Sequence, residues 1–267
     1  MSNYDAKKLK ALFLDMDGVI WSGKDPIGNL SDLFRKIETL GLIPLFGTNN
    51  ASRTPDEYVN RLKGYEVNIQ IDQVFSSALG AVYELKKRCP DKHKIYAIGS
   101  DDFKNFLRSN GFTLVESGAD AVLTSLDRDL TYQKLAAAMQ NINNGAAFFA
   151  TNDDKTIPFG DHFEPGAGMI AAALQICTGE KPYVFGKPNT VMIDMARKRF
   201  NLLPEEVLAV GDRYDTDIMG GINDHAQTAL VLSGIETIDS IRERDPQPDI
   251  ICSNLTELVD RLAEDRK

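Results

Sequence analysis

The segment Ala11-Leu12-Phe13-Leu14-Asp15-Met16-Asp17-Gly18 joins a short apolar run to two aspartates and a glycine. An apolar run of this length, entered from a charged segment, is typical of a buried strand. Because residues two apart point to the same side of an extended backbone, we expect the carboxylates of Asp15 and Asp17 to face one spot beyond the strand end. Two like charges this close are costly unless a cation or a shared proton relieves them. By itself the tetrapeptide also suits a solvated turn.

Composition and charge exclude several classes of protein. The chain has 267 residues, enough for two domains, with 43% hydrophobic and 26% charged residues, as in ordinary globular proteins. Its net charge of −9 opposes a nucleic-acid polymer as partner. A small phosphorylated metabolite still fits, because a local site can be positive within an acidic protein. The chain shows no membrane-length apolar stretch, no signal-peptide pattern and only three scattered cysteines, so we expect a cytoplasmic protein without a membrane partner.

Apolar runs alternate with helical patterns, which predicts an α/β fold with a mainly parallel, Rossmann-like sheet. The clearest helix start is Thr54-Pro55-Asp56-Glu57, with an N-cap threonine and a proline at the first helical position. Asn254 to Leu262 predicts a terminal helix with its leucines and Val259 on one face. The predicted strands are Ala11 to Leu14, Leu42 to Phe46, Lys94 to Ile98, Ala121 to Thr124, Ala146 to Ala150, Tyr183 to Phe185, Val207 to Val210, Thr228 to Leu232 and Asp249 to Cys252.

The chain divides into a core and an insertion. Residues 78–183 contain three strand candidates with helices between them, enough for a second small α/β domain. We therefore expect a core domain built from residues 1–77 and 184–267, with residues 78–183 inserted into it.

Four predicted strands end in side chains that a phosphoryl-transfer site needs. Catalysis at a highly charged phosphate monoester is mostly positioning and charge stabilisation. Mg²⁺ prefers oxygen ligands and takes only a few carboxylates. A lysine, a hydroxyl and a backbone N–H can bind the phosphate oxygens. The candidate residues are Asp15, Asp17, Thr48, Asn49, Lys187, Asp212 and Asp217.

With these residues in this order, the chain resembles the haloacid dehalogenase-like superfamily of phosphohydrolases over nearly its whole length. It is most similar to the branch of 4-nitrophenylphosphatase-like, ribonucleotide monophosphatase-like and phosphoglycolate phosphatase enzymes, which carry a large α/β cap. The segments that carry this second resemblance are Asn49-Asn50, Ser52-Arg53-Thr54-Pro55, Pro165-Gly166-Ala167-Gly168, Gly186-Lys187-Pro188 and Gly211 to Ile218.

The resemblance implies a role for each candidate residue. Asp15 would be the nucleophile that forms an aspartyl-phosphate, and Asp17 the general acid and base. Asp15, the main-chain carbonyl of Asp17, and Asp212 would hold Mg²⁺. Asp217 would orient Lys187 or the waters on the metal. The inserted domain would be a cap that chooses the leaving group, and the family makes a homodimer through the cap an expectation.

Several points stay open from sequence alone. The substrate could be a nucleotide monophosphate, a sugar phosphate, phosphoglycolate or an aryl phosphate. The alternatives are another superfamily reaction, such as phosphomutase chemistry, and a phosphoacceptor signalling domain. Dehalogenation needs neither Asp17 nor Asp212, and signalling domains are about half as long. The roles of loops 127–129 and 151–154, and of Asp224-His225, are undecided. Trp21 suits either a substrate wall or the core.

Overall fold

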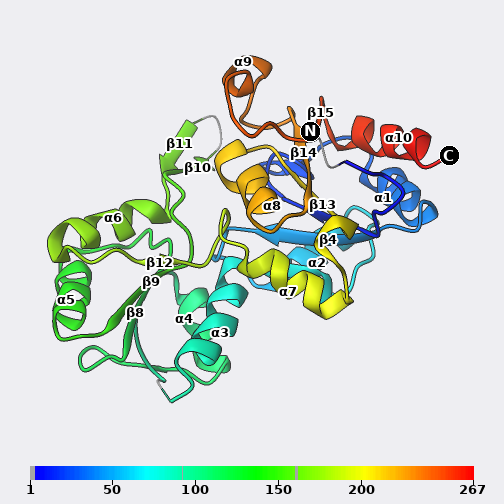
Figure 1. Ribbon diagram of the computed structural model, residues 1–267. Coiled ribbons are helices and arrows are strands. Elements are labelled where there is room, and N and C mark those ends of the chain that lie inside the picture. Colours follow the sequence, from blue (N-terminus) through cyan, green and yellow to red (C-terminus); the bar gives the residue numbers. More distant parts are fainter. Residues whose placement is uncertain (1–3, 92, 160–161) are drawn as a thin grey trace. The chain divides into compact units, whose positions relative to one another are not determined.

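The computed structural model describes residues 4–91, 93–159 and 162–267 (Figure 1). The chain splits into two compact units by its internal contacts. The first unit contains residues 1–48, 55–75 and 187–267, and the second contains residues 49–54 and 76–186. In the described residues, none of the helices combines the length and the apolar character that crossing a bilayer requires.

The first unit is built on a six-stranded sheet with the order β15-β14-β13-β1-β4-β5. The ladders that join β15, β14, β13, β1 and β4 are all parallel. The strands are β1 (Ala11–Leu14), β4 (Ile43–Thr48), β5 (Val74–Ser76), β13 (Val207–Gly211), β14 (Gln227–Val231) and β15 (Ile250–Cys252), and a separate hairpin joins β2 (Trp21–Ser22) to β3 (Asp25–Pro26).

The first unit also contains the helices that pack with this sheet. Its central strand β1 is buried along its whole length. Leu12 and Leu14 belong to a core cluster with apolar side chains from α1, α2 and α10, whereas Phe13, on the alternate side of the strand, contacts the ring of Phe75. The helices are α1 (Leu30–Thr39), α2 (Pro55–Lys63), α7 (Val191–Phe200), α8 (Met219–Asn223), α9 (Ile238–Ile241) and α10 (Leu255–Asp265), with short helical turns at Ile71–Gln73, Pro204–Glu206 and Tyr214–Ile218.

The second unit has its own five-stranded sheet, with the order β12-β9-β8-β6-β7. Two core clusters form, one with side chains from α3 and α4 and the other with side chains from α5 and α6. The elements are α3 (Ser77–Arg88), β6 (Lys94–Ile98), α4 (Asp101–Ser109), β7 (Thr113–Leu114), β8 (Ala121–Thr124), α5 (Tyr132–Asn143), β9 (Ala147–Ala150), β10 (Thr156–Phe159), β11 (His162–Pro165), α6 (Ala167–Thr178) and β12 (Tyr183–Val184).

Local sequence explains several helix starts. A Ser, Thr or Asn side chain accepts a hydrogen bond from a backbone N–H of the first turn and so satisfies a donor that lacks a helical partner. The capping residues are Asn29 for α1, Ser76 for α3, Ser100 for α4, Thr131 for α5 and Asn254 for α10.

The α/β fold class with a parallel sheet is confirmed, and the nine predicted strands all exist with small shifts at their ends. The strands β2, β3, β5, β7, β10 and β11 were not predicted, because they are only two to four residues long and carry no clear alternation. The strand ahead of Lys187 differs from expectation in its sheet: β12 pairs with β9 in the second unit and not with the core strands.

Replacing Leu12 by alanine is expected to lower the free energy of unfolding by about 2–5 kcal/mol, because the residue is fully buried at the centre of the sheet. Leu203→Ala is the matched control. Its side chain is 56% exposed, so its loss should stay within about 0.5 kcal/mol. Urea unfolding followed by circular dichroism compares the two variants, and equal losses would contradict the assigned position of β1.

Candidate active site

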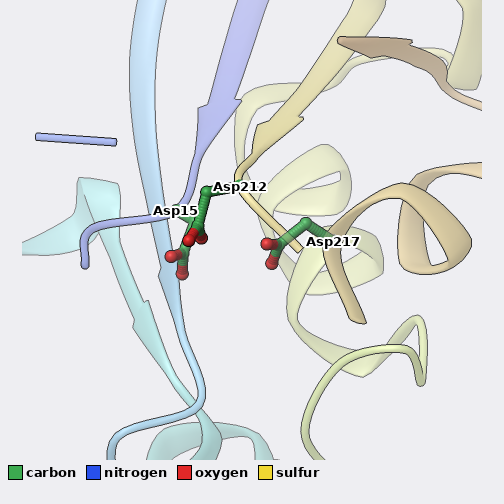
Figure 2. A group of neighbouring side chains, drawn as sticks. All are labelled: Asp15, Asp212 and Asp217. Atoms are coloured by element: carbon green, nitrogen blue, oxygen red, sulfur yellow. The ribbon is translucent and has the colours of Figure 1, made fainter. Parts of the chain in front are cut away.

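Three aspartates meet at the carboxyl edge of the six-stranded sheet. Asp15 directly follows β1, Asp212 directly follows β13, and Asp217 lies in the helical turn Tyr214–Ile218. Because β1 and β13 are parallel neighbours, in register from Leu14 to Val210, the residues after them lie side by side. One carboxylate oxygen from each aspartate lies within 4.8 Å of the others. Figure 2 shows Asp15 and Asp212 close together, with the carboxylate of Asp217 turned toward them.

Lys187 places a buried ammonium among these carboxylates. Its Nζ lies 2.5 Å from Asp15 Oδ1 and 2.6 Å from Asp217 Oδ1, and it donates a hydrogen bond to the main-chain oxygen of Gly47. Burial lowers the pKa of Lys187, but the charges of Asp15 and Asp217 outweigh it, so its pKa is raised. The lysine therefore stays charged. Asp217 Oδ2 accepts a hydrogen bond from the main-chain N–H of Arg213, and this bond fixes the orientation of the Asp217 carboxylate.

Burial dominates the acid–base properties of the aspartates. It raises the pKa of Asp15 well above its usual range, although the nearby charge of Lys187 opposes the rise. Burial together with the charge of Asp217 raises the pKa of Asp212 to about 7, against the opposing hydrogen bond from the Ile235 N–H. When all three carboxylates are ionised, the single ammonium of Lys187 leaves an excess of negative charge. A cation would relieve this excess.

The Asp212 carboxylate has an oxygen that could bind such a cation. Asp212 Oδ1 is buried and has no hydrogen-bond partner among the described residues, whereas Oδ2 accepts the Ile235 N–H at 2.9 Å. A Cβ at Gly18 or at Gly234 would collide with the Asp212 carboxylate, so only glycine leaves it room. Gly18 also has a φ of +84°, a conformation that favours glycine. An unpartnered oxygen in a group of carboxylates matches the oxygen ligands that Mg²⁺ prefers.

Asp17 differs from Asp15 in its surroundings. Its side chain is exposed, it is not a member of the group formed by Asp15, Asp212 and Asp217, and its Oδ1 accepts a hydrogen bond from the Trp21 indole at 2.9 Å. The Asp17 carboxylate therefore lies outside the group that Asp15 joins, and β1 ends at Leu14, ahead of both aspartates. That the Asp15 and Asp17 carboxylates face one spot stays a prediction. A metal contact from Asp17 would have to come from its main-chain carbonyl.

The second predicted motif lies at the end of β4. Thr48 is the last residue of this strand, which pairs with β1, so it lies at the same edge as Asp15. Asn49 is buried and groups with the second unit. The Asn49 side chain donates to Asp154, and its main-chain oxygen accepts hydrogen bonds from Ser77 and Asn152.

The polar residues left undecided by sequence have local structural partners. In the second unit, Asp127 is buried and binds Lys134 at 2.8 Å, and Arg128 forms an ion pair with Glu164. Asp224 receives two hydrogen bonds from Arg197 and so joins α7 to the end of α8. Trp21 is completely buried in the core cluster of the first unit, which excludes a substrate wall.

Sequence reasoning missed the segment after β14. The Ser233 hydroxyl donates to the main-chain oxygen of Gly18, Gly234 makes room for Asp212, and the Ile235 N–H binds the Asp212 carboxylate. This segment directly follows the predicted strand Thr228 to Leu232, so the expectation that site residues lie beyond strand ends applies to it as well.

Asp212→Asn is expected to stabilise the metal-free protein at pH 8. Folding raises the pKa of Asp212 from 3.8 to about 7, so between these values the folded state holds a proton that the unfolded chain has lost. Stability conferred by that proton is therefore present at low pH and is lost as pH rises through this window. Melting temperatures in chelator from pH 4 to 8 test this. The exposed Asp215→Asn is the control, and identical pH slopes for wild type and Asp212→Asn would refute the prediction.

Comparisons with known proteins agree with this geometry. The family model described as haloacid dehalogenase-like hydrolase matches residues 12–113, and one described as HAD-hydrolase-like matches residues 184–258. The chain is 32% identical over 253 residues to a 5'-nucleotidase of Bacillus subtilis, covering 95% of this chain and 98% of the relative. It is 32% identical over 257 residues to an acid sugar phosphatase of Staphylococcus haemolyticus, covering 96% of this chain and 97% of that protein.

Solved structures show the same fold. A 4-nitrophenylphosphatase from Thermotoga maritima superposes with a TM-score of 0.90 at 29% identity, covering 96% of this chain and 98% of that one. A glycerol phosphate phosphatase from Mycobacterium tuberculosis, solved in complex with magnesium, has a TM-score of 0.87 at 29% identity and covers 95% of this chain and 77% of that one.

Proposed function

Because this chain belongs to the haloacid dehalogenase-like hydrolases and matches phosphatases over nearly its full length, it is a phosphatase of small substrates, and we propose that it acts with Mg²⁺ through an aspartyl-phosphate. The observation that supports this mechanism is the group of Asp15, Asp212 and Asp217 around Lys187, with one buried Asp212 oxygen unpartnered among the described residues. Asp15, Asp212 and the main-chain carbonyl of Asp17 would hold the ion. When bound, Mg²⁺ neutralises charge on the phosphoryl oxygens.

Asp15 is the proposed nucleophile. Its Oδ1 is held by Lys187, which leaves Oδ2 to attack phosphorus. As the bond from Asp15 to phosphorus forms, the bond to the leaving oxygen breaks, and Asp17 gives that oxygen its proton. Asp17 then takes a proton from water, the water oxygen bonds to phosphorus, and the bond to Asp15 breaks. Inorganic phosphate leaves and both aspartates return to their starting forms.

The remaining residues bind and orient the phosphate. We assign the Thr48 hydroxyl, the backbone N–H of Asn49 and the Lys187 ammonium to its oxygens. Asp217 holds Lys187 from its far side at 2.6 Å, so it acts on the phosphate through the lysine. The inserted α/β unit, expected at residues 78–183, is the proposed cap that selects the leaving group, and a homodimer through this cap stays a proposal.

Asp15→Asn is expected to abolish turnover, with a loss of at least about 10³-fold in kcat, because an amide cannot form the phosphoryl intermediate. Asp215→Asn, an exposed aspartate of the last motif, should keep wild-type rates. The assay is phosphate release from 4-nitrophenyl phosphate with Mg²⁺. Full activity of Asp15→Asn would exclude the mechanism.

Chelation is expected to remove activity, and added Mg²⁺ to restore it, since the three carboxylates carry more charge than Lys187 offsets. Measuring rates against free Mg²⁺ at fixed ionic strength checks this. A chelated enzyme with full turnover would leave the carboxylate group without the proposed role.

The relatives act on different small phosphate substrates, so their names do not identify the substrate of this protein. Their names include a 5'-nucleotidase, an acid sugar phosphatase and a 4-nitrophenylphosphatase. Specificity constants for a nucleotide monophosphate, a sugar phosphate, phosphoglycolate and an aryl phosphate rank the candidates. Product analysis distinguishes hydrolysis from phosphomutase chemistry, and label from acetyl phosphate that accumulates on the protein would favour a phosphoacceptor domain.

A further inference from the structure

The buried side chain of Trp21 contacts Asp17, the proposed general acid and base, which is not a member of the group formed by Asp15, Asp212 and Asp217. Trp21 is fully buried, and its indole N–H donates to Asp17 Oδ1 at 2.9 Å. An indole is a donor only, and when buried it needs an acceptor. Here the acceptor is one oxygen of the Asp17 carboxyl group. Among the described residues, no other donor to the Asp17 side chain is found.

The ring of Trp21 is itself fixed by α2. It stacks on Tyr58 with an angle of 2° between the ring planes, and the guanidinium of Arg61 lies 3.8 Å from its centroid. Arg61 and Tyr65 of the same helix also donate to the main-chain oxygens of Gly23 and Lys24, in the loop between β2 and β3. The indole N–H therefore points in a direction set by a packed helix and a hairpin.

The backbone holds Trp21 and Asp17 close to each other as well. The N–H of Gly18 donates to the main-chain oxygen of Trp21 at 2.8 Å, and Asp17 and Trp21 form a β-bridge. Asp17 itself is exposed, and an exposed carboxylate free of partners samples several rotamers. The hydrogen bond from the buried ring removes this freedom.

We propose that Trp21 is a positioning residue for Asp17, and that it directs proton transfer to one oxygen of that carboxylate. Because Oδ1 accepts the indole N–H, the proton that Asp17 gives to the leaving oxygen and takes from water resides on Oδ2. A general acid held in place before the reaction avoids the cost of ordering it in the transition state. This inference rests on the acid–base role given to Asp17 under the proposed function.

The leaving group distinguishes positioning from a merely structural role. The specificity constant kcat/KM reports the steps up to the first phosphoryl transfer. An alkoxide needs a proton as it leaves, whereas 4-nitrophenolate leaves readily without one. Trp21→Phe keeps an aromatic ring for Tyr58 and Arg61 and removes the N–H. We expect kcat/KM to fall about 10- to 100-fold for an alkyl phosphate and less than about threefold for 4-nitrophenyl phosphate.

Two further variants test whether the effect of Trp21→Phe depends on Asp17 and on the indole N–H. Asp17→Asn should show the same dependence on the leaving group with a larger loss. Arg61→Gln keeps the indole N–H and the stacking of the ring on Tyr58, which still orients it, so this variant should lower both specificity constants by a similar, small factor. Equal losses on both substrates for Trp21→Phe would overturn the positioning role while leaving the proposed function intact. Absence of leaving-group dependence in Asp17→Asn would instead overturn the role of Asp17, and this inference with it. A wild type without phosphatase activity would overturn both.

Trp21 is the only tryptophan of the chain, so an analogue can replace it without changing any other residue. Biosynthetic incorporation of benzothienylalanine puts sulfur in place of the indole N–H and nearly preserves the ring shape. This protein should reproduce the selective loss on alkyl phosphates even if Trp21→Phe fails to fold. Full activity on alkyl phosphates in this protein would exclude the proposal.

Discussion

The burial of three carboxylates with a single ammonium is the constraint that organises this molecule. Lys187 binds Asp15 and Asp217 directly, while Asp212 keeps one buried oxygen without a partner among the described residues. Burial of like charges is unfavourable, and it raises the pKa values of Asp15 and Asp212. The carboxylates therefore repel one another at the edge of the sheet. Because a bound cation would relieve this repulsion, the arrangement favours binding of the ion and, through the ion, of phosphate.

Close approach of these charges depends on what the backbone leaves out. A side chain at Gly18 or Gly234 would collide with the carboxylate of Asp212, and one at Gly211 would collide with Asp217. The parallel pairing of β1 with β13 and β4 brings three strand ends to one edge. The parallel sheet thus brings the acidic residues to one edge, and the glycines leave space for their carboxylates.

Asp15 and Asp17 show how two like residues, two positions apart, acquire different properties. Asp15 is held by a buried lysine, which suits a nucleophile that must stay in place. Asp17 is exposed and held on one oxygen by a neutral donor, Trp21, which suits a group that must exchange a proton with substrate and water. The turn after Leu14 separates the two environments, and the indole gives the second one its orientation.

Much of this arrangement could be inferred from local pattern. The apolar run before Asp15 and those before Thr48 and Asp212 identify strands, and parallel strands present their carboxyl ends at one edge, so the candidate residues and the α/β class follow from residue order. Other features depend on contacts through space, which periodicity does not encode. They include the pairing of β12 with β9, the membership of Asp217 in the carboxylate group and the bond from Trp21 to Asp17. Chain order specifies which side chains end a strand, but only packing sets the distances on which charge and proton transfer depend.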